Sequence, residues 1–308
     1  MCAGTKEQLF GSPTHELDAG GESRSGFTLV ELLVVVGIVS VLMGILMPAL
    51  GMARRQAKAI LGSSNQRQII GAVGCYAADN EDRYPLSVAT VGTWPSFNWT
   101  EPTTLVGYKK LTPQLNRSMS TYLGSYVSEG SVFSCPSAPK EHTYLQDAWE
   151  AGEDWANPEM PIPMTPLSGT YCFYWNYDGY LGGERVVFRG PGGPMGGRRE
   201  SKLLVSCYLG SDHWRSRKVY SSCERFGGAG VTDETWMASA YWSGRDADDS
   251  VETIEIKPRA GYTDGHVESY SSSDVAPMEV IQDPVTNEPY YPPQAGPGIF
   301  YLPQAALY

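Results

Sequence analysis

The chain is short of positive charge. Its 308 residues include 23 lysines and arginines against 34 aspartates and glutamates, so the formal net charge at pH 7 is −11. A surface of this sign repels the phosphate backbone that a nucleic-acid-binding protein has to neutralise. The composition therefore argues against nucleic acid as the main ligand.

The sequence also lacks the motifs that accompany common catalytic and metal sites. No two cysteines have C-x-x-C spacing, which argues against structural zinc. The glycine-rich run at residues 190–199 is not followed by Lys-Ser or Lys-Thr, so a surface loop is favoured over a phosphate-binding loop. Asp212 and His213 have no G-x-S-x-G motif nearby, and Asp264 and His266 have no accompanying nucleophile. We expect no catalytic residue and no cofactor.

What the sequence does contain is one long stretch without charge, from Leu32 to Leu50. As a helix rising about 1.5 Å per residue it would span roughly 28 Å, close to the hydrocarbon thickness of a bilayer. We therefore predict a membrane-spanning helix. One acid, Glu31, directly precedes this stretch, and a carboxylate near lipid is costly enough to mark a functional group that has a partner.

The segment in front of the helix, residues 1–26, is polar and ends in Ser25-Gly26. In a secretory signal peptide the apolar core precedes the cleavage site, whereas here it follows. A polar leader, then G-F-T-L-V-E at residues 26–31, then an uncharged helix resembles type IV prepilins and the related pseudopilins of type II secretion.

This resemblance implies that a membrane peptidase cuts after Gly26 and methylates the new amino terminus at Phe27. It also implies that Glu31 attracts the amine of a neighbouring subunit, which is mostly protonated at neutral pH and keeps its charge on methylation. Desolvation of the two charges offsets much of their attraction in a filament core. We therefore interpret the pair first as a device that sets register and second as a source of stability.

Pro48 lies inside the predicted helix and cannot donate a hydrogen bond to the Gly44 carbonyl. We expect it to kink or loosen the helix, as prolines at the corresponding place do in related pilins. The helix should continue through residues 51–79 and end near Asp79–Asn80, with Gly62 as a candidate bend. Helical spacing places four residues on one face of this second half: Ile69, Val73, Tyr76 and Ala77.

Residues 80–308 are interpreted as one exported head. The expected fold is α+β, with the long helix packed on an antiparallel sheet. Several strings resemble large prepilin-like proteins abundant in planctomycetes, verrucomicrobia and lentisphaerae, namely residues 65–85, CPSA at 135–138, YWNYDGY at 174–180 and TDGHVESY at 263–270. Ile254 stands where the last signature usually has a histidine.

Two short patterns near the C-terminus predict strands. Residues 251–256 alternate with period two, and Asp264-Gly265 is a strong two-residue turn, so D-G-H-V is interpreted as a hairpin rather than a site. The nearby acids could supply oxygens to calcium, which major pseudopilins bind late in the head. We favour a solvated acidic loop, assign no metal ligand and leave calcium open for Asp246, Asp248, Asp249 and Glu252.

Loss of the leader would remove Cys2 and leave five cysteines in an oxidising compartment, at least one of them unpaired. We expect the bridges among Cys135, Cys172, Cys207 and Cys223, for which three connectivities are open. Cys75 is interpreted as a small buried helix residue.

We expect a structural subunit, a pilin or pseudopilin that is not an enzyme. Its partners would be a prepilin peptidase, other subunits, an inner-membrane assembly platform and membrane lipid. The alternative is a membrane-tethered extracellular binding protein or enzyme acting on a ligand such as glycan, which the many aromatic side chains could contact.

The orientation expected from the family is an inner-membrane, single-pass chain with its head exported to the periplasm or cell surface. Arg54, Arg55 and Lys58 follow the helix and only Arg24 closely precedes it, so the positive-inside rule favours the opposite orientation. We follow the resemblance because the leader must face its peptidase. Whether the chain is a pilus or secretion subunit, whether it is major or minor, and what the head binds stay open.

Overall fold

The protein is described by a computed structural model. The described residues are 27–94, 97–106, 118–139, 143–156, 158, 167–181, 186–197, 199–211, 218–224, 232–236, 240–246, 251, 254–280 and 299–307. The chain divides into two compact units, with the boundary between Met52 and Ala53.

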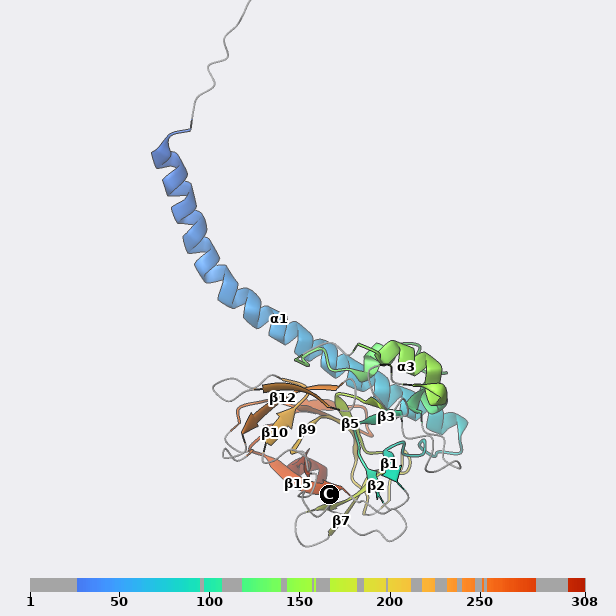
Figure 1. Cartoon of the computed structure of the whole chain (residues 1–308). Coiled ribbons are helices and arrows are strands. Elements are labelled where there is room, and N and C mark those ends of the chain that lie inside the picture. Colours follow the sequence, from blue (N-terminus) through green and yellow to red (C-terminus); the bar gives the residue numbers. More distant parts are fainter. Residues whose placement is uncertain are drawn as a thin grey trace, which may run out of the picture. The chain divides into compact units, whose positions relative to one another are not determined.

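One helix, α1 (Leu29–Asp79), supplies the first unit and continues into the second (Figure 1). Its N-terminal half contains one stretch that is long and apolar enough to cross a membrane, and none of that stretch is buried. The large apolar side chains there are exposed, with Leu29 at 79% and Met47 at 70%. Pro48 lies within the helix, whose assignment is continuous through it and through Gly62.

The second half of α1 buries the face that helical spacing predicts. Ile69, Val73 and Ala77 are fully buried, and Tyr76 packs against the same core. Burial of an aliphatic side chain as large as Ile69 contributes about 1.5–3 kcal/mol. The helix ends at Asp79, as expected.

The end of α1 is closed by backbone hydrogen bonds. Glu81 has a positive φ of 56°, and the Asp82 N–H donates to the Ala77 carbonyl at 2.9 Å. This bond reaches back five residues, as in the Schellman motif that satisfies the last carbonyls of a helix. The chain then turns toward Tyr84.

The strands of the second unit form antiparallel sheets. The largest has eight strands in the order β11 (Thr232–Trp236), β12 (Ala240–Asp246), β10 (Lys218–Ser221), β9 (Leu209–Ser211), β16 (Ile299–Pro303), β15 (Val275–Val280), β6 (Asp178–Leu181) and β7 (Val186–Arg189). A second has four, in the order β14 (Val267–Ser269), β13 (Arg259–Tyr262), β8 (Leu203–Cys207) and β5 (Tyr171–Phe173). The two smaller pairs are β1 (Thr90–Trp94) with β2 (Phe97–Thr100), and β3 (Thr104–Val106) with β4 (Leu167–Ser168). The expected α+β fold is confirmed.

Short helices complete the described elements. They are α2 (Met119–Leu123), η1 (Gly130–Phe133), α3 (Leu145–Ala151), η2 (Gly152–Asp154) and η5 (Gln304–Leu307).

The four-stranded sheet separates two hydrophobic cores. On β5, Tyr171 and Phe173 belong to the core shared with α1, whereas Cys172 belongs to the core shared with the eight-stranded sheet. This follows from the period of two along a strand, which sends successive side chains to opposite faces. The second unit is thus layered as helix, sheet and sheet.

The strand predicted at residues 251–256 is wrong for the part that the structure describes. The alternation does predict burial correctly, since Ile254 and Ile256 are buried and Glu255 is exposed. No ladder forms, because the Ile256 N–H donates to the Ile254 carbonyl and the Ser272 hydroxyl donates to that same carbonyl. The Ile254 carbonyl is thus occupied by a local turn and a serine, while the Ile256 carbonyl accepts from the Ser272 N–H at 3.4 Å.

The hairpin predicted at D-G-H-V is confirmed, but its two-residue turn is wrong: the Tyr262 N–H donates to the His266 carbonyl at 3.1 Å, so three residues, 263–265, connect the strands. It joins β13 to β14, with Ala260 paired to Glu268 and Gly261 paired to Val267. The Gly265 N–H donates to the Tyr262 carbonyl at 2.9 Å, and Gly265 has a φ of 88°. That left-handed conformation is the one that glycine adopts without steric cost.

Candidate functional site

The clearest group of interacting candidate residues lies at the N-terminus of α1. The backbone N–H and the hydroxyl of Thr28 both donate to Glu31 Oε2 at 2.8 Å, and the Glu31 N–H donates to Thr28 Oγ1 at 3.3 Å. This reciprocal arrangement is a capping box, which satisfies two backbone donors that a helix otherwise leaves without partners. Glu31 therefore holds its carboxylate at the first turn of the apolar helix.

Sequence reasoning missed Thr28. The signal was present, because Thr28-Leu29-Val30-Glu31 has the T-x-x-E spacing of a capping box directly before an apolar run. The carboxylate that marks the site is thus also the residue that starts the helix.

The other expected site residues stand as follows. Phe27 directly precedes the capping box and is 73% exposed. Pro48 lies inside α1 without ending it. Gly26 lies outside the described residues, so the cleavage position stays a prediction, as do the roles of the other three.

Comparison with known protein families gives one match. Residues 23–47 match the model of the prokaryotic N-terminal methylation motif. This supports a type IV pilin-like protein. The motif implies processing by a prepilin peptidase and assembly with other pilin subunits, and together with the apolar helix it indicates a single-pass membrane-anchored chain. No curated protein and no solved structure matches the chain.

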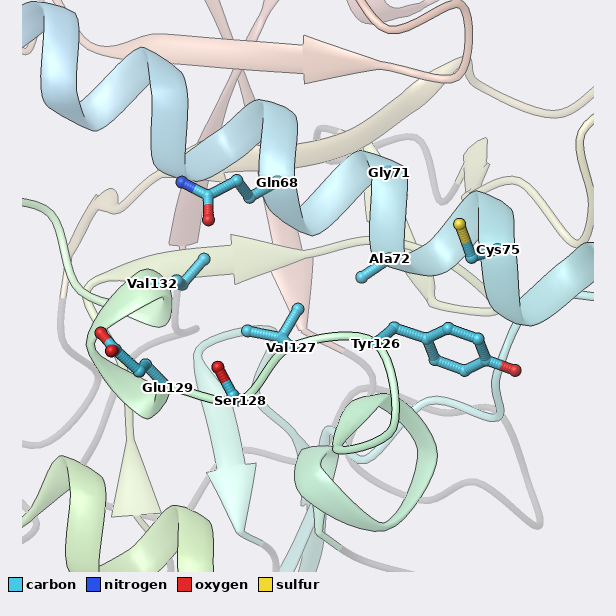
Figure 2. Close-up of a pocket in the computed structure, with 9 residues that line it drawn as sticks. All are labelled: Gln68, Gly71, Ala72, Cys75, Tyr126, Val127, Ser128, Glu129 and Val132. Carbon is cyan, nitrogen blue, oxygen red and sulfur yellow. The ribbon is translucent and has the colours of Figure 1, made fainter.

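A groove of about 500 Å³ lies beside the second half of α1. Figure 2 shows side chains of the helix on one side and the segment leading into η1 on the other. Its lining residues are Gln68, Gly71, Ala72, Cys75, Tyr126, Val127, Ser128, Glu129 and Val132. This lining contains a thiol and a carboxylate but no histidine or lysine beside them, so it lacks a paired nucleophile and base.

Cys75 is exposed, and its expected burial is wrong. Each helical residue advances by about 100°, so Cys75 lies roughly 200° around the helix from Val73, away from the buried face.

A group of sulfur atoms lies inside the core beneath α1. Cys207 and Cys223 form a disulfide, while Cys135 and Cys172 are free and buried. The structure therefore contains one of the bridges that were left open. Cys172 stays apart because its side chain lies on the opposite face of β5 from Tyr171.

The glycine-rich run has a structural role within its described part. The Glu200 carboxylate accepts hydrogen bonds from the backbone N–H groups of Gly192 and Gly197, at 3.2 and 2.8 Å. The Gly192 carbonyl accepts from Tyr84 N–H at 3.0 Å. The Glu200 carboxylate thus already accepts from backbone amides of the kind that bind phosphate. This agrees with the expected surface loop.

The remaining acidic candidates are exposed or outside the described residues. His266 Nδ1 lies 2.5 Å from Asp264 Oδ1, and the ring stacks on Tyr262 with centroids 4.4 Å apart. Hydrogen bonds from the His266 side chain and backbone lower the pKa of Asp264. Residues outside the description include Asp212, His213, Asp248, Asp249 and Glu252, and nothing is described of the Asp246 side chain.

Proposed function

We propose that the chain is a structural subunit of a type IV pilus-like or type II secretion filament. It is cut after Gly26, is N-methylated at Phe27 and polymerises through the N-terminal half of α1. The observation that carries this proposal is the match to the methylation motif at the start of an exposed apolar helix. No chemistry by the head is needed for this role.

The capping box gives Glu31 its part in assembly. Its carboxylate is held at the start of the helix by Thr28, one residue after Phe27. Cleavage would turn the Phe27 amide into a cationic amine, a natural partner for that carboxylate. In a filament the amine of a neighbouring subunit takes this place and sets the axial register of the two helices.

The proposed location follows from the same processing. The leader faces a peptidase of the inner membrane, the apolar helix lies in lipid, and the head is exported to the periplasm or cell surface. The further partner is an inner-membrane assembly platform, which would extract the subunit from lipid. The apolar residues that are exposed in the isolated chain would then be covered by other subunits.

Four of the aromatic side chains are buried and so are not available to the alternative, a tethered glycan-binding protein. Tyr171, Tyr174, Trp175 and Tyr177 are each at most 1% exposed. Rings that stack on sugars have to face solvent. These rings are core residues of the two hydrophobic clusters and are not available to an extracellular ligand.

Mass spectrometry of the purified protein tests the processing. We expect an N-terminus at Phe27 with one added methyl group in cells that contain the peptidase. Replacing Gly26 by a bulky residue should leave the leader attached and prevent filaments. A mature-sized chain from the Gly26 variant would contradict the proposal.

Variants of the capping box separate assembly from helix formation. Thr28→Ala removes the cap but keeps the carboxylate, whereas Glu31→Gln keeps an acceptor at the cap but removes the charge. We expect Thr28→Ala to assemble, and Glu31→Gln to insert into membranes and fail to assemble. Filament yield by electron microscopy is the readout, and normal filaments from Glu31→Gln would refute the role of the charge.

A further inference from the structure

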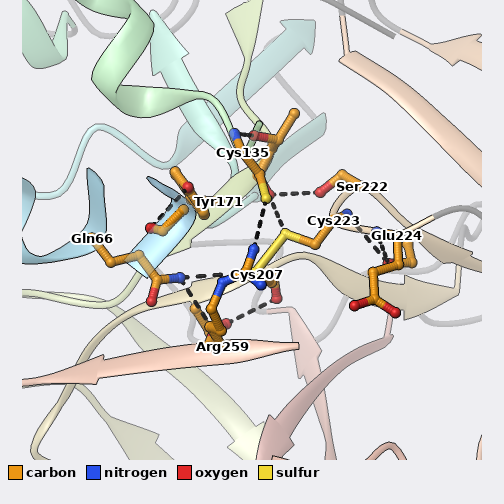
Figure 3. Close-up of a disulfide and its surroundings, with 12 residues drawn as sticks. Gln66, Cys135, Tyr171, Cys207, Ser222, Cys223, Glu224 and Arg259 are labelled. Atoms are coloured by element: carbon orange, nitrogen blue, oxygen red, sulfur yellow. Dashed lines mark hydrogen bonds between the residues drawn. A yellow bond between two sulfur atoms is a disulfide. The ribbon is translucent and has the colours of Figure 1, made fainter. Parts of the chain in front are cut away.

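We propose that Cys135, Cys207 and Cys223 form a buried thiol–disulfide exchange centre, in which the free thiol of Cys135 exchanges with the Cys207–Cys223 disulfide. The three sulfur atoms lie within 4.8 Å of one another, and each residue is at most 2% exposed. Figure 3 shows their side chains converging with that of Arg259.

The three cysteines come from separate segments that hydrogen bonds hold in place. Cys207 ends β8 and Cys223 follows β10, while Cys135 follows η1. The Cys135 N–H donates to Thr170 Oγ1 at 2.6 Å, and the preceding carbonyl of Ser134 accepts from Asn65 Nδ2 at 3.0 Å. The third sulfur is therefore fixed beside the bridge by both α1 and the strand region.

A buried guanidinium accompanies the cluster. Arg259 is 2% exposed, and its Nη2 donates to Cys135 Sγ at 3.1 Å. Among the described residues no carboxylate lies within salt-bridge distance of it, although Glu224 interacts with it electrostatically, and its Nε has no hydrogen-bond partner. A buried cation needs a compensating charge. Glu224 supplies part of this charge from outside salt-bridge distance, and a thiolate at Cys135, which accepts directly from the guanidinium, would supply it at hydrogen-bond distance.

The same guanidinium argues against a metal ion in this cluster. Three thiolates can bind a soft metal, but a cation within hydrogen-bond distance of Cys135 Sγ would repel it. Thiol–disulfide exchange needs the opposite, a positive group near the sulfur that carries the charge.

The exchange step balances within the three residues. The Cys135 thiol gives up its proton and its sulfur attacks Cys207 Sγ. A Cys135–Cys207 bond forms, the Cys207–Cys223 bond breaks, and the Cys223 thiolate leaves and takes up the proton that Cys135 gave up. Attack on Cys223 Sγ gives a Cys135–Cys223 bond and releases Cys207 instead. One disulfide and one thiol are present before and after, so no oxidant or reductant is consumed.

The exchange changes what the disulfide joins. The present bridge spans only 16 residues of the chain and links two strand ends. Either product would tie the segment after η1 covalently to the sheets. Exchange therefore replaces a bridge that joins strands of the sheets with one that joins a strand to the Cys135 segment, which packs against α1.

Cys172 provides an internal control. It is 1% exposed, but it lies in the other core, and its burial raises the pKa of its thiol. A buried thiol in apolar surroundings is inert. Cys172 should therefore stay free whatever happens at the other three residues.

The test uses the full-length oxidised protein in detergent. It is incubated at pH 8, quenched with acid, unfolded and alkylated while acidic, then digested without reduction and analysed by mass spectrometry. We expect Cys135, Cys207 and Cys223 each to be alkylated in part of the molecules, with peptides linked through Cys135. Cys172 should be alkylated fully, and the Cys172→Ala variant should give the same mixture.

Two single variants isolate the alternative bridges. Cys223→Ala should oxidise to a Cys135–Cys207 bridge, and Cys207→Ala to a Cys135–Cys223 bridge, with circular dichroism used to check folding. The wild-type measurement decides alone if either variant fails to fold. Alkylation of Cys135 but neither Cys207 nor Cys223 in the incubated wild type would overturn the proposal.

Discussion

Replacing Gly62 with alanine tests how closely α1 approaches the four-stranded sheet. A Cβ atom at this position would lie 2.6 Å from Arg259 Nη2 and 3.1 Å from its Cζ. The first separation is too short for a nonbonded contact, so the guanidinium has to move. It is buried and donates to Cys135 Sγ, so moving it disturbs that hydrogen bond.

Gly62→Ala has opposing effects on stability, and their magnitudes decide whether the free energy of unfolding rises or falls. Alanine in place of glycine within a helix contributes up to about 1 kcal/mol of stability. Overpacking a filled core costs about 1–3 kcal/mol, and a hydrogen bond from a charged group contributes about 1.5–3 kcal/mol. We expect Gly62→Ala to lower the free energy of unfolding by about 1.5–5 kcal/mol, with a fall in Tm of about 2–4 °C for each kcal/mol.

Gly74→Ala is the matched control. Gly74 is an exposed residue of the same helix, and a Cβ there would meet nothing within 4 Å. It should raise the free energy of unfolding by about 0.5–1 kcal/mol, since only helix propensity changes. Both variants are compared by thermal unfolding of the full chain in detergent. Equal stabilisation by the two substitutions would refute the close approach at Gly62.

Three further predictions concern the head. Replacing both Cys207 and Cys223 with serine should lower the free energy of unfolding in denaturant by about 3 kcal/mol, given the 16-residue separation; an unchanged midpoint would contradict this. Burial raises the pKa of Glu224 above its ordinary value of 4.5, against the opposing effects of Lys257 and Arg259. A carboxyl with a raised pKa stabilises the fold below its unfolded pKa and loses that contribution as pH rises through the folded value. Glu224→Gln should therefore stabilise the protein at pH 7 and not at pH 4. Thermal unfolding at both pH values checks this. Asn176 Nδ2 donates to the Tyr84 and Pro85 carbonyls at 3.1 and 2.7 Å; Asn176→Asp keeps the shape without the donor and should cost about 1–3 kcal/mol in chemical denaturation, whereas an unaltered transition would show that the contact is dispensable.

The sequence predicted the long helix well because its signal is periodic over many residues. The buried positions Ile69, Val73 and Ala77 follow from helical spacing, and so does the exposure of Cys75. The wrong interpretation of Cys75 came from weighing the residue type above its angular position. Where periodicity and residue preference disagree on a helix, geometry decides which side faces the core.

Long-range pairing was less accessible from the sequence. Alternation at residues 251–256 predicted which of the described side chains are buried but not that residues 254–256 would lie outside any strand. The disulfide between Cys207 and Cys223 depends on β9 and β10 lying antiparallel, which no local pattern encodes. Spacing along the chain cannot select among cysteines that only the folded sheets bring together.

At the start of α1, the Glu31 carboxylate caps its own helix and, in the proposed filament, also pairs with the amine of a neighbouring subunit. In the chain as described, Glu31 already has partners, the backbone and side chain of Thr28. After cleavage the amine of Phe27 in the same chain would lie beside the same turn and could also neutralise it. A neighbouring subunit's amine would therefore displace existing interactions rather than satisfy a bare charge, and its net gain would be small. Replacing one set of partners of Glu31 by another aligns two helices specifically but contributes little to the strength of their association. The energy of assembly would then come from covering the exposed apolar surface of the helix.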